Sequence, residues 1–324
     1  MITVDFVVDT PVELVEKFAA HFRLDVDELK SYFISVNPNI LVPEVIVRKF
    51  DLNLNKYDSN KLSILCRHIT TANEESLDSF KEAGILNLRE MFQEETPLSN
   101  FLKKHEIEVN VDKAIIKIGN REYPILQSGE ICPYCYIGRK KICTGYSRCD
   151  LFDKLLILAS KLFYYNATVE CFINTSLPKM KRYSTICRCP EILGTLDKVY
   201  SVARDLLDNP YTLCNDWISE KKDCYLLLFP VLISEMVTFE PISFDAAYDD
   251  IRGCLEYCGY TDSDYYEKKV AQDFYNNYYF MKTFISIYFF DKEIYGSLLF
   301  DMSVAPDVIK FFKVDGDVLV KVSD

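Results

Sequence analysis

Two hairpin patterns constrain the fold of this chain more than any other feature of its sequence. Residues 114–125 alternate in hydrophobicity on both sides of Gly119-Asn120, and residues 311–322 do so on both sides of Asp315-Gly316. Glycine beside asparagine or aspartate favours the two-residue turns that join neighbouring antiparallel strands. A doubly wound parallel sheet lacks such hairpins, so we predict an α+β fold with a mixed, mainly antiparallel sheet and flanking helices.

Residues 1–55 are expected to form an N-terminal helical segment. A capping box with proline at the first helical position opens a helix over residues 10–22, and a second helix is expected over residues 26–35. The pair loosely resembles a helix-turn-helix motif, but Asp27 and Glu28 stand where a DNA-reading helix needs arginine or asparagine. We therefore expect both helices to pack on the core.

Strand and helix patterns alternate along the remainder of the chain. Alternating apolar residues at 50–54 and a continuous apolar run at 225–233 predict strands. Helical periodicity is present over residues 150–165, 190–207 and 263–280. We expect residues 56–324 to form one α+β domain.

Composition limits the partners and the compartment. The 324 residues are 49% hydrophobic and carry a net charge of −12, which supports a full apolar core and disfavours a general electrostatic grip on nucleic acid. Basic clusters at residues 139–141 and 179–182 leave a local contact with nucleic acid open. No N-terminal signal and no apolar run of membrane-spanning length is visible, so we expect a cytoplasmic protein that does not contact membranes.

Four of the twelve cysteines lie in a short insertion at about residues 128–150. Cys132 and Cys135 have the C-x2-C spacing that lets two thiolates reach one metal ion, and Cys143 and Cys149 follow with a wider spacing. A structural zinc site made of these four residues is one interpretation. Reduced, unligated cysteines in a tyrosine-rich loop are the other, because a cytoplasmic chain keeps its thiols reduced.

A strand, a polar corner and a short helix follow one another over residues 62–86. The apolar strand is expected to end at residue 69, which places His68 and Thr70 at the rim of a sheet. Asn73 suits the N-cap of the next helix, and Gly84 suits its C-terminal stop. The corner is either a binding site or a place where His68 makes a structural hydrogen bond.

The same residues resemble the opening motif of ADP-ribosyltransferase-fold proteins, in particular the DarT-like and RNA 2′-phosphotransferase-like branches. The resemblance implies an ADP-ribosyltransferase-like core in which His68, Thr70 and Thr71 contact NAD, the substrate. It further implies that Tyr183 and Ser184, in a segment similar to the family's central region, lie beside the nicotinamide.

The C-terminal segment resembles the family's last strand and its V-P-x-x-I ending, here at residues 304–309. The family's catalytic glutamate is expected near Ser297 or Leu298, and the acidic residue that most closely precedes these positions is Glu293, several residues early. A carboxylate matters there because cleavage of the bond to nicotinamide builds an oxocarbenium-like ribose, whose charge the carboxylate stabilises. Glu293 and His68 are therefore the expected catalytic residues, and the other candidate glutamates are Glu191 and Glu235.

Two functions follow from these patterns. The first is an NAD-dependent ADP-ribosyltransferase-like protein that modifies a macromolecule, with a toxin or a phage-defence effector as the class that the resemblance suggests. The alternative is a non-enzymatic binding or scaffold protein, stabilised by a zinc knuckle, that recognises a protein or a nucleic acid. The sequence has no P-loop, Rossmann glycine motif or nucleophile elbow, so common nucleotide-binding and hydrolase assignments lack support.

Overall fold

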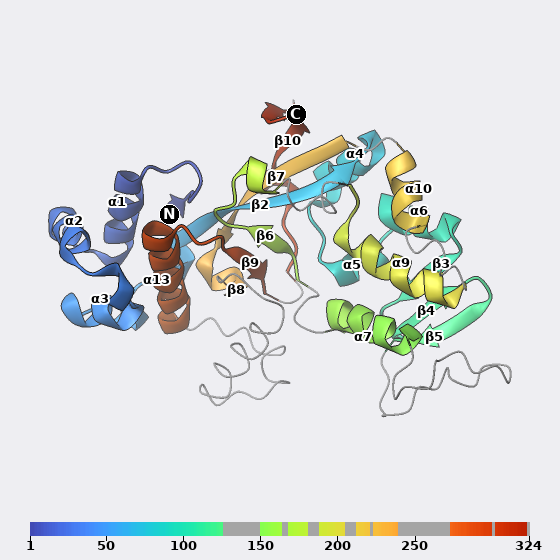
Figure 1. Cartoon of the computed structure of the whole chain (residues 1–324), viewed down its shortest axis with the longest axis horizontal. Coiled ribbons are helices and arrows are strands. Elements are labelled where there is room, and N and C mark those ends of the chain that lie inside the picture. The colour runs from blue at the N-terminus through green and yellow to red at the C-terminus, as the bar shows by residue number, and fades with distance from the viewer. Residues whose placement is uncertain are drawn as a thin grey trace. The chain divides into compact units, whose positions relative to one another are not determined.

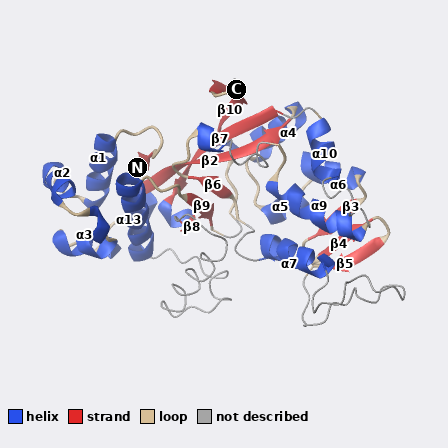
Figure 2. Cartoon of the chain, viewed as in Figure 1, coloured by secondary structure: helices blue, strands red, loops and turns tan. Residues whose placement is uncertain are grey.

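The computed structural model is a mixed α+β structure, as the hairpin patterns predict (Figures 1 and 2). Apart from the parallel pair formed by the first strand, the strand pairs whose register is defined are antiparallel. Within the described residues, no helix combines the length and the apolarity needed to cross a membrane. The structure describes residues 1–125, 150–163, 168–180, 188–204, 212–220, 223–238, 273–299 and 302–322.

The chain divides into two compact units. The first unit consists of Met1–His68, Glu170–Met180 and Leu228–Phe300, and the second consists of Ile69–Val169, Lys181–Leu227 and Asp301–Asp324. The expected boundary at residue 55 is not a boundary between these units. Two strands instead cross from one unit to the other, β2 (Leu62–Ala72) after His68 and β7 (Asp223–Leu232) after Leu227.

The sheet of the first unit is organised around β2. β1 pairs with the beginning of β2 in parallel, and β6 pairs with β2 in antiparallel fashion through Arg67 and Phe172. The order continues from β6 through β9 to β8, while β7 is the neighbour of β2 on the other side. These strands are β1 (Ile2–Val4), β6 (Glu170–Phe172), β8 (Met236–Thr238) and β9 (Tyr295–Leu298), and the short helix α8 (Leu177–Met180) follows β6.

The N-terminal helices begin where their caps predict. Thr10 and Glu13 form the expected capping box of α1 (Pro11–Phe22), and Asp25 caps α2 (Val26–Ser35) through the Glu28 N–H. The strand expected at residues 50–54 is wrong. Phe50 instead caps α3 (Pro43–Lys49), and the short 3-10 helices η1 (Pro38–Ile40), η2 (Leu54–Lys56) and η3 (Ser59–Lys61) occupy this part of the chain.

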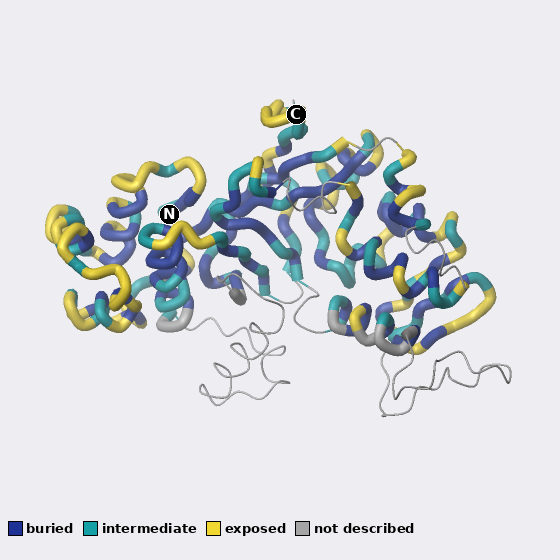
Figure 3. Tube along the Cα trace, viewed as in Figure 1, coloured by how far each residue is buried: buried dark blue, intermediate teal, exposed yellow. Residues whose placement is uncertain are grey.

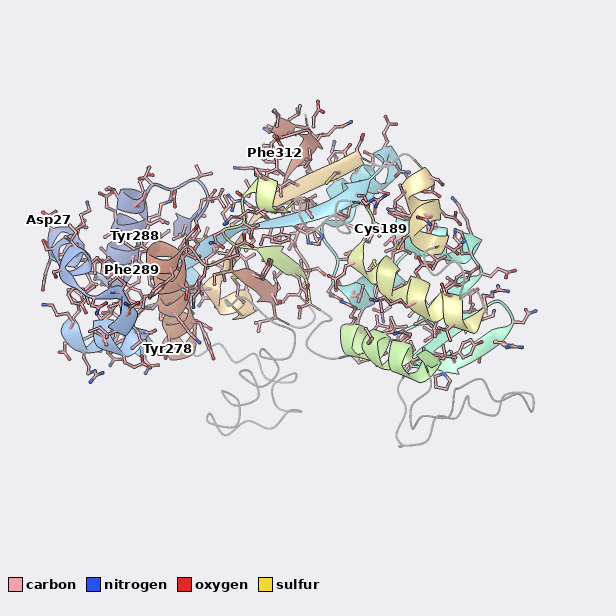
Figure 4. The ribbon with its side chains drawn as sticks, in the orientation of Figure 1. Asp27, Cys189, Tyr278, Tyr288, Phe289 and Phe312 are labelled. Carbon is pink, nitrogen blue, oxygen red and sulfur yellow. The ribbon has the colours of Figure 1, made fainter. Side chains whose placement is uncertain are left out.

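Helix α13 (Asp273–Phe290) supplies the core on which the N-terminal helices pack (Figure 1). Phe18 of α1 lies with its ring centroid 6.0 Å from that of Phe280 and 4.5 Å from that of Phe284. Phe33 of α2 contacts Tyr288 and Phe289 near the end of α13, both of which Figure 4 labels. Aromatic residues carry large apolar areas, so their burial stabilises this helical cluster. The expected packing of α1 and α2 on the core is therefore confirmed.

The second unit contains a separate three-stranded antiparallel sheet and the C-terminal hairpin. Both predicted hairpins are confirmed, the first as β4 and β5 and the second as β10 and β11. β10 is also the neighbour of β7. The strands are β3 (Ile107–Asn110), β4 (Ile115–Ile118), β5 (Arg121–Pro124), β10 (Lys310–Asp315) and β11 (Val318–Lys321).

Helices cover the three-stranded sheet and enclose the core of the second unit. Leucines 155, 158 and 162 of α7 are buried with Leu193 and Leu196 of α9 and with Trp217 of α10. Each fully buried leucine contributes roughly 1.5–3 kcal/mol relative to an exposed one. The helices of this unit are α4 (Glu74–Ala83), α5 (Leu88–Gln93), α6 (Pro97–Lys104), α7 (Asp150–Phe163), α9 (Glu191–Ala203) and α10 (Thr212–Ser219).

Candidate functional site

His68 lies within β2 and not at its end. The strand continues beyond the expected end at residue 69 as far as Ala72, so the polar corner comes three residues later than predicted. Leu65 and His68 are the only residues of β2 that are not fully buried, and Figure 3 shows the strand as buried along most of its length. His68 is therefore the partly exposed polar side chain of this strand.

The ring of His68 is oriented by a backbone carbonyl. Its Nδ1 lies 2.9 Å from the carbonyl oxygen of Glu170, at the start of β6. A carbonyl oxygen only accepts, so Nδ1 carries the proton, and Nε2 is an acceptor in the neutral ring. This arrangement contains the structural hydrogen bond that the sequence left open, and it also fixes the direction of the ring.

The two threonines that follow have different surroundings. Thr70 is buried and, being two residues from His68 in a strand, projects from the same face. Thr71 projects from the opposite face, and its Oγ1 accepts a hydrogen bond of 2.9 Å from Nε1 of Trp217. Of the three residues expected to contact NAD, only His68 and Thr70 therefore share a face.

Helix α4 has the caps that the sequence predicts. The Oδ1 of Asn73 accepts from the N–H of Ser76, and Gly84 ends the helix at a φ of 79°. A side chain at this glycine would place its Cβ 1.9 Å from the carbonyl oxygen of Val304. Glycine is required here both for its backbone conformation and for this close approach.

The close approach joins two segments that carry the family resemblance. Ile85 and Val304 exchange backbone hydrogen bonds of 3.0 Å and 2.8 Å, which pairs the end of the first motif with the start of the V-P-x-x-I ending. Ser303 extends this contact because its Oγ accepts from the N–H of Asn87 at 2.7 Å. The two motifs are thus neighbours in space although they lie near opposite ends of the chain.

Glu293 lies at a distance from His68. In β6, Phe172 pairs with Arg67 of β2 on one side and with Tyr295 of β9 on the other. By this register His68 lies opposite Cys171. Glu293 lies opposite Asn174. Three residues along β6 and two strand spacings across the sheet separate the two backbones by roughly 14 Å. The carboxylate of Glu293 instead forms an ion pair of 3.2 Å with Nζ of Lys179.

The positions at which the family's glutamate is expected lie closer to His68. Ser297 of β9 pairs with Glu170 of β6, the residue whose carbonyl accepts from His68. A serine there has no charge with which to stabilise an oxocarbenium ion. The other candidate glutamates have other partners, since Glu191 pairs with Lys161 and the backbone carbonyl of Glu235 accepts from Leu299.

The remaining predicted site residues lie outside the described residues. They are Tyr183 and Ser184, expected beside the nicotinamide, and Cys132, Cys135, Cys143 and Cys149, expected to bind zinc. Among the residues that the structure describes, no group of three or more histidine, cysteine or acidic side chains has the arrangement of a metal site.

One polar cluster was not predicted from the sequence. The buried carboxylate of Asp197 in α9 accepts hydrogen bonds from the N–H groups of Leu213 and Cys214, and so caps the first turn of α10 from outside that helix. Burial raises the pKa of Asp197, while these two hydrogen bonds act to lower it. No sequence pattern links the two helices, because an ordinary N-cap is local.

A pair of thiols lies beside this carboxylate. The Sγ atoms of Cys189, labelled in Figure 4, and Cys214 are 3.4 Å apart, and both side chains are buried. Their mutual hydrogen bond lowers the pKa of Cys189 and raises that of Cys214. The two residues stand 25 positions apart, and nothing in their spacing distinguishes them from the other buried cysteines.

No protein-family model matches the sequence, and comparisons with curated proteins and with solved structures gave no match.

Proposed function

We propose that the chain is an ADP-ribosyltransferase-like protein that binds NAD at the face of β2 formed by His68 and Thr70. The observation that carries this proposal is the backbone pairing of Ile85 with Val304, because it joins the two separate segments that resemble the family. The capped helix α4 and the glycine stop at Gly84 agree with the same motif. The proposed core is thus the ADP-ribosyltransferase-like form of the α+β fold.

His68 is proposed to contact the dinucleotide directly. The Glu170 carbonyl holds the ring in one orientation, and a preorganised donor or acceptor loses less conformational entropy when a ligand binds. Ribose hydroxyl groups both donate and accept, so the ring can bond one of them. Thr70 adds a hydroxyl on the same face, while Thr71 stabilises the core through Trp217.

The transfer step requires a carboxylate near the reacting ribose. Cleavage breaks the bond between C1 of the ribose and the nicotinamide nitrogen, and a nucleophile on the target macromolecule forms the new bond to C1. Glu293 is the proposed carboxylate, and its ion pair with Lys179 must open before it can serve. Because Glu293 lies away from His68, we propose that NAD binds more readily than it reacts.

Calorimetric titration with NAD tests the binding site. We expect His68→Ala to weaken NAD binding at least about tenfold, which corresponds to roughly 1.4 kcal/mol. His105→Ala is the matched control, since His105 is also half-buried but lies at the end of α6 with its ring against Phe101. This control is expected to bind NAD like the natural chain.

A second variant separates ligand contact from structure. In His68→Asn the amide nitrogen can still donate to the Glu170 carbonyl, so the structural bond persists while the outer part of the ring is lost. We expect His68→Asn to keep the melting temperature and to lose NAD affinity. Unchanged affinity in His68→Asn and His68→Ala, or no NAD binding by the natural chain, would contradict the proposal and leave the non-enzymatic interpretation.

Release of nicotinamide tests the proposed catalytic residue. Glu293→Gln is expected to lower the release rate while leaving NAD affinity unchanged, because a carboxylate that acts on the transition state contributes little to ground-state binding. Glu191→Gln removes a carboxylate in α9 that pairs with Lys161 and serves as the control. Equal release rates in all three proteins would exclude Glu293 from this role.

A further inference from the structure

The C-terminal hairpin places an exposed apolar strand, β11, at one end of the strand order β11-β10-β7-β2-β6-β9-β8. β11 pairs with β10 on one side, and no other described strand pairs with it. Val318, Leu319 and Val320 are exposed by 63%, 38% and 49%, and they form the only run of three exposed large apolar residues in the described chain. Figure 3 shows the end of this hairpin in the colour of exposed residues beside the label of the C-terminus, whereas most of β10 is intermediate or buried.

The free edge of β11 can form hydrogen bonds with another strand. The N–H of Val322 donates to the carbonyl of Phe311, and the register alternates from there back to the turn. The N–H and C=O groups of Val318 and Val320 therefore point toward β10, whereas those of Leu319 and Lys321 point away from it. An added strand must pair with these outward groups.

The sequence of this edge is complementary to itself. Residues 317–321 read Asp-Val-Leu-Val-Lys, with an acid at one end, a base at the other and apolar residues between them. In an antiparallel pair centred on Leu319, Val318 of each copy faces Val320 of the other. Asp317, the last residue of the turn before β11, comes opposite Lys321 of the other copy. The outward groups of Leu319 meet those of the second Leu319, so this register satisfies the backbone as well as the charges.

Other registers fit less well. Centring the pair on Val320 places Lys321 against Leu319, and centring it on Lys321 places two lysines opposite each other, which is unfavourable. If the twofold axis lies between two residues, a residue whose N–H and C=O point away from β10 comes opposite one whose groups point toward β10. Backbone hydrogen bonds between the copies are then not formed. The register centred on Leu319 is the one that pairs both charges.

From this complementarity we propose that β11 is a dimerisation edge whose occupant is the β11 strand of a second copy of this chain. The pairing extends the sheet across a twofold axis and buries the exposed valines against each other. A four-residue edge is small compared with the interface of a stable complex, so the dimer is weak and depends on concentration. Both copies are acidic, and physiological salt screens their repulsion beyond about 8 Å.

Sedimentation velocity over a concentration series tests the proposal with charge variants. We expect Lys321→Asp or Asp317→Lys alone to raise the dimer dissociation constant about tenfold or more, because each replaces two attractive pairs with two repulsive ones. The double variant Asp317→Lys/Lys321→Asp restores both pairs in the reverse sense. We expect its dissociation constant to return to within about threefold of the natural value.

A neutral variant distinguishes a lysine that pairs with Asp317 of the second copy from a lysine that prevents association of the edge strands. Lysine on an edge strand can also serve to prevent association. Under our proposal Lys321→Thr weakens the dimer, and Lys310→Thr, on the exposed part of β10, leaves it unchanged. The proposal is overturned if the natural chain stays monomeric at its highest soluble concentration, if the double variant fails to restore association, or if Lys321→Thr strengthens it.

Discussion

The first unit buries an ion pair, whereas the second unit buries a carboxylate that backbone groups satisfy. In the first, Nη2 of Arg67 lies 2.5 Å from Oδ1 of Asp5, and Nη1 donates to the carbonyl of Ile173. In the second, Asp197 accepts from the N–H groups of Leu213 and Cys214. Removing Arg67 leaves Asp5 without a counter-charge, although its carboxylate still accepts from the N–H groups of Val7 and Val8. Removing the Asp197 carboxylate leaves two backbone donors without their acceptor.

This difference sets how each unit should respond to substitution. An unpaired buried charge is among the most costly defects in a protein interior, because desolvation is no longer offset by attraction. An unpaired N–H at a helix start costs less, since the helix end can shift or admit water. The following predictions begin with the zinc ion proposed for the cysteine insertion and then test this ranking.

Zinc removal is expected to have the largest effect. The cysteine insertion lies in the sequence between β5 and α7 of the second unit, and structural zinc sites in small peptides contribute about 10 kcal/mol or more. We expect one zinc ion per chain by elemental analysis, and a strong chelator should speed hydrogen exchange in peptides of the second unit first.

Cysteine variants provide the control for the metal. Cys132→Ser should lower the zinc content, whereas Cys224→Ser, in β7 and outside the insertion, should not. A zinc-free natural chain would refute the prediction and favour unligated thiols.

Breaking the ion pair of the first unit is the next largest effect. Arg67→Met should lower the free energy of unfolding by about 3–5 kcal/mol, because Asp5 stays buried without its partner. Urea unfolding measures this difference. Lys30→Met, which removes the exposed pair with Glu16, should cost less than about 1 kcal/mol. A similar loss in both variants would mean that burial does not set the cost of breaking the pair.

Removing the remote cap of α10 is expected to cost less than the buried ion pair. Asp197→Ala should destabilise the chain by about 2 kcal/mol, since two buried N–H groups lose their acceptor. Hydrogen exchange of the Leu213 and Cys214 amides should accelerate by more than that of α9. Asp216→Ala, at an exposed position of α10, is the control and should leave both amides unchanged. Equal acceleration in the two variants would argue against a capping role for Asp197.

Local signals in the sequence predicted the local structure well. The bounds of α1 and α2 agree with the structure because each helix has a side-chain cap within three residues. The strand expected at residues 50–54 failed because Asn53 accepts from the N–H of Asn55 and favours a 3-10 turn over an extended strand. Short alternation is a weak signal when such a residue lies inside it.

The candidate site depended on contacts that no local pattern contains. The hydroxyl of Thr71 bonds to Trp217, 146 residues later, and the carbonyl that orients His68 belongs to Glu170. β2 continues beyond residue 69 to Ala72 because Thr70 and Thr71 are β-branched, and β-branched side chains fit the pleated surface of a strand. Residue types singled out the candidate residues, but only tertiary pairing could divide them between two faces.

The smallest expected effect concerns His21, another buried polar side chain of the first unit. Nε2 of His21 lies 2.5 Å from Oδ1 of Asn277, whose amide nitrogen donates to the carbonyls of Leu54 and Tyr57. Because these carbonyls fix the amide, Oδ1 accepts from a protonated Nε2. Burial lowers the pKa of His21, and the Asn277 hydrogen bond and the nearby Asp273 and Asp58 only partly oppose it.

A lowered histidine pKa makes stability fall on the acid side of neutrality. Below the ordinary histidine pKa of about 6.5 the unfolded chain binds a proton that folded His21 resists, and the loss levels off once the pH is below the folded pKa. One proton limits the slope to about 1.4 kcal/mol per pH unit. We expect urea unfolding at about pH 7.5 and about pH 5.5, on either side of that pKa, to show a smaller difference in His21→Gln than in the natural chain. An equal difference in both proteins would mean that other groups cause the acid sensitivity.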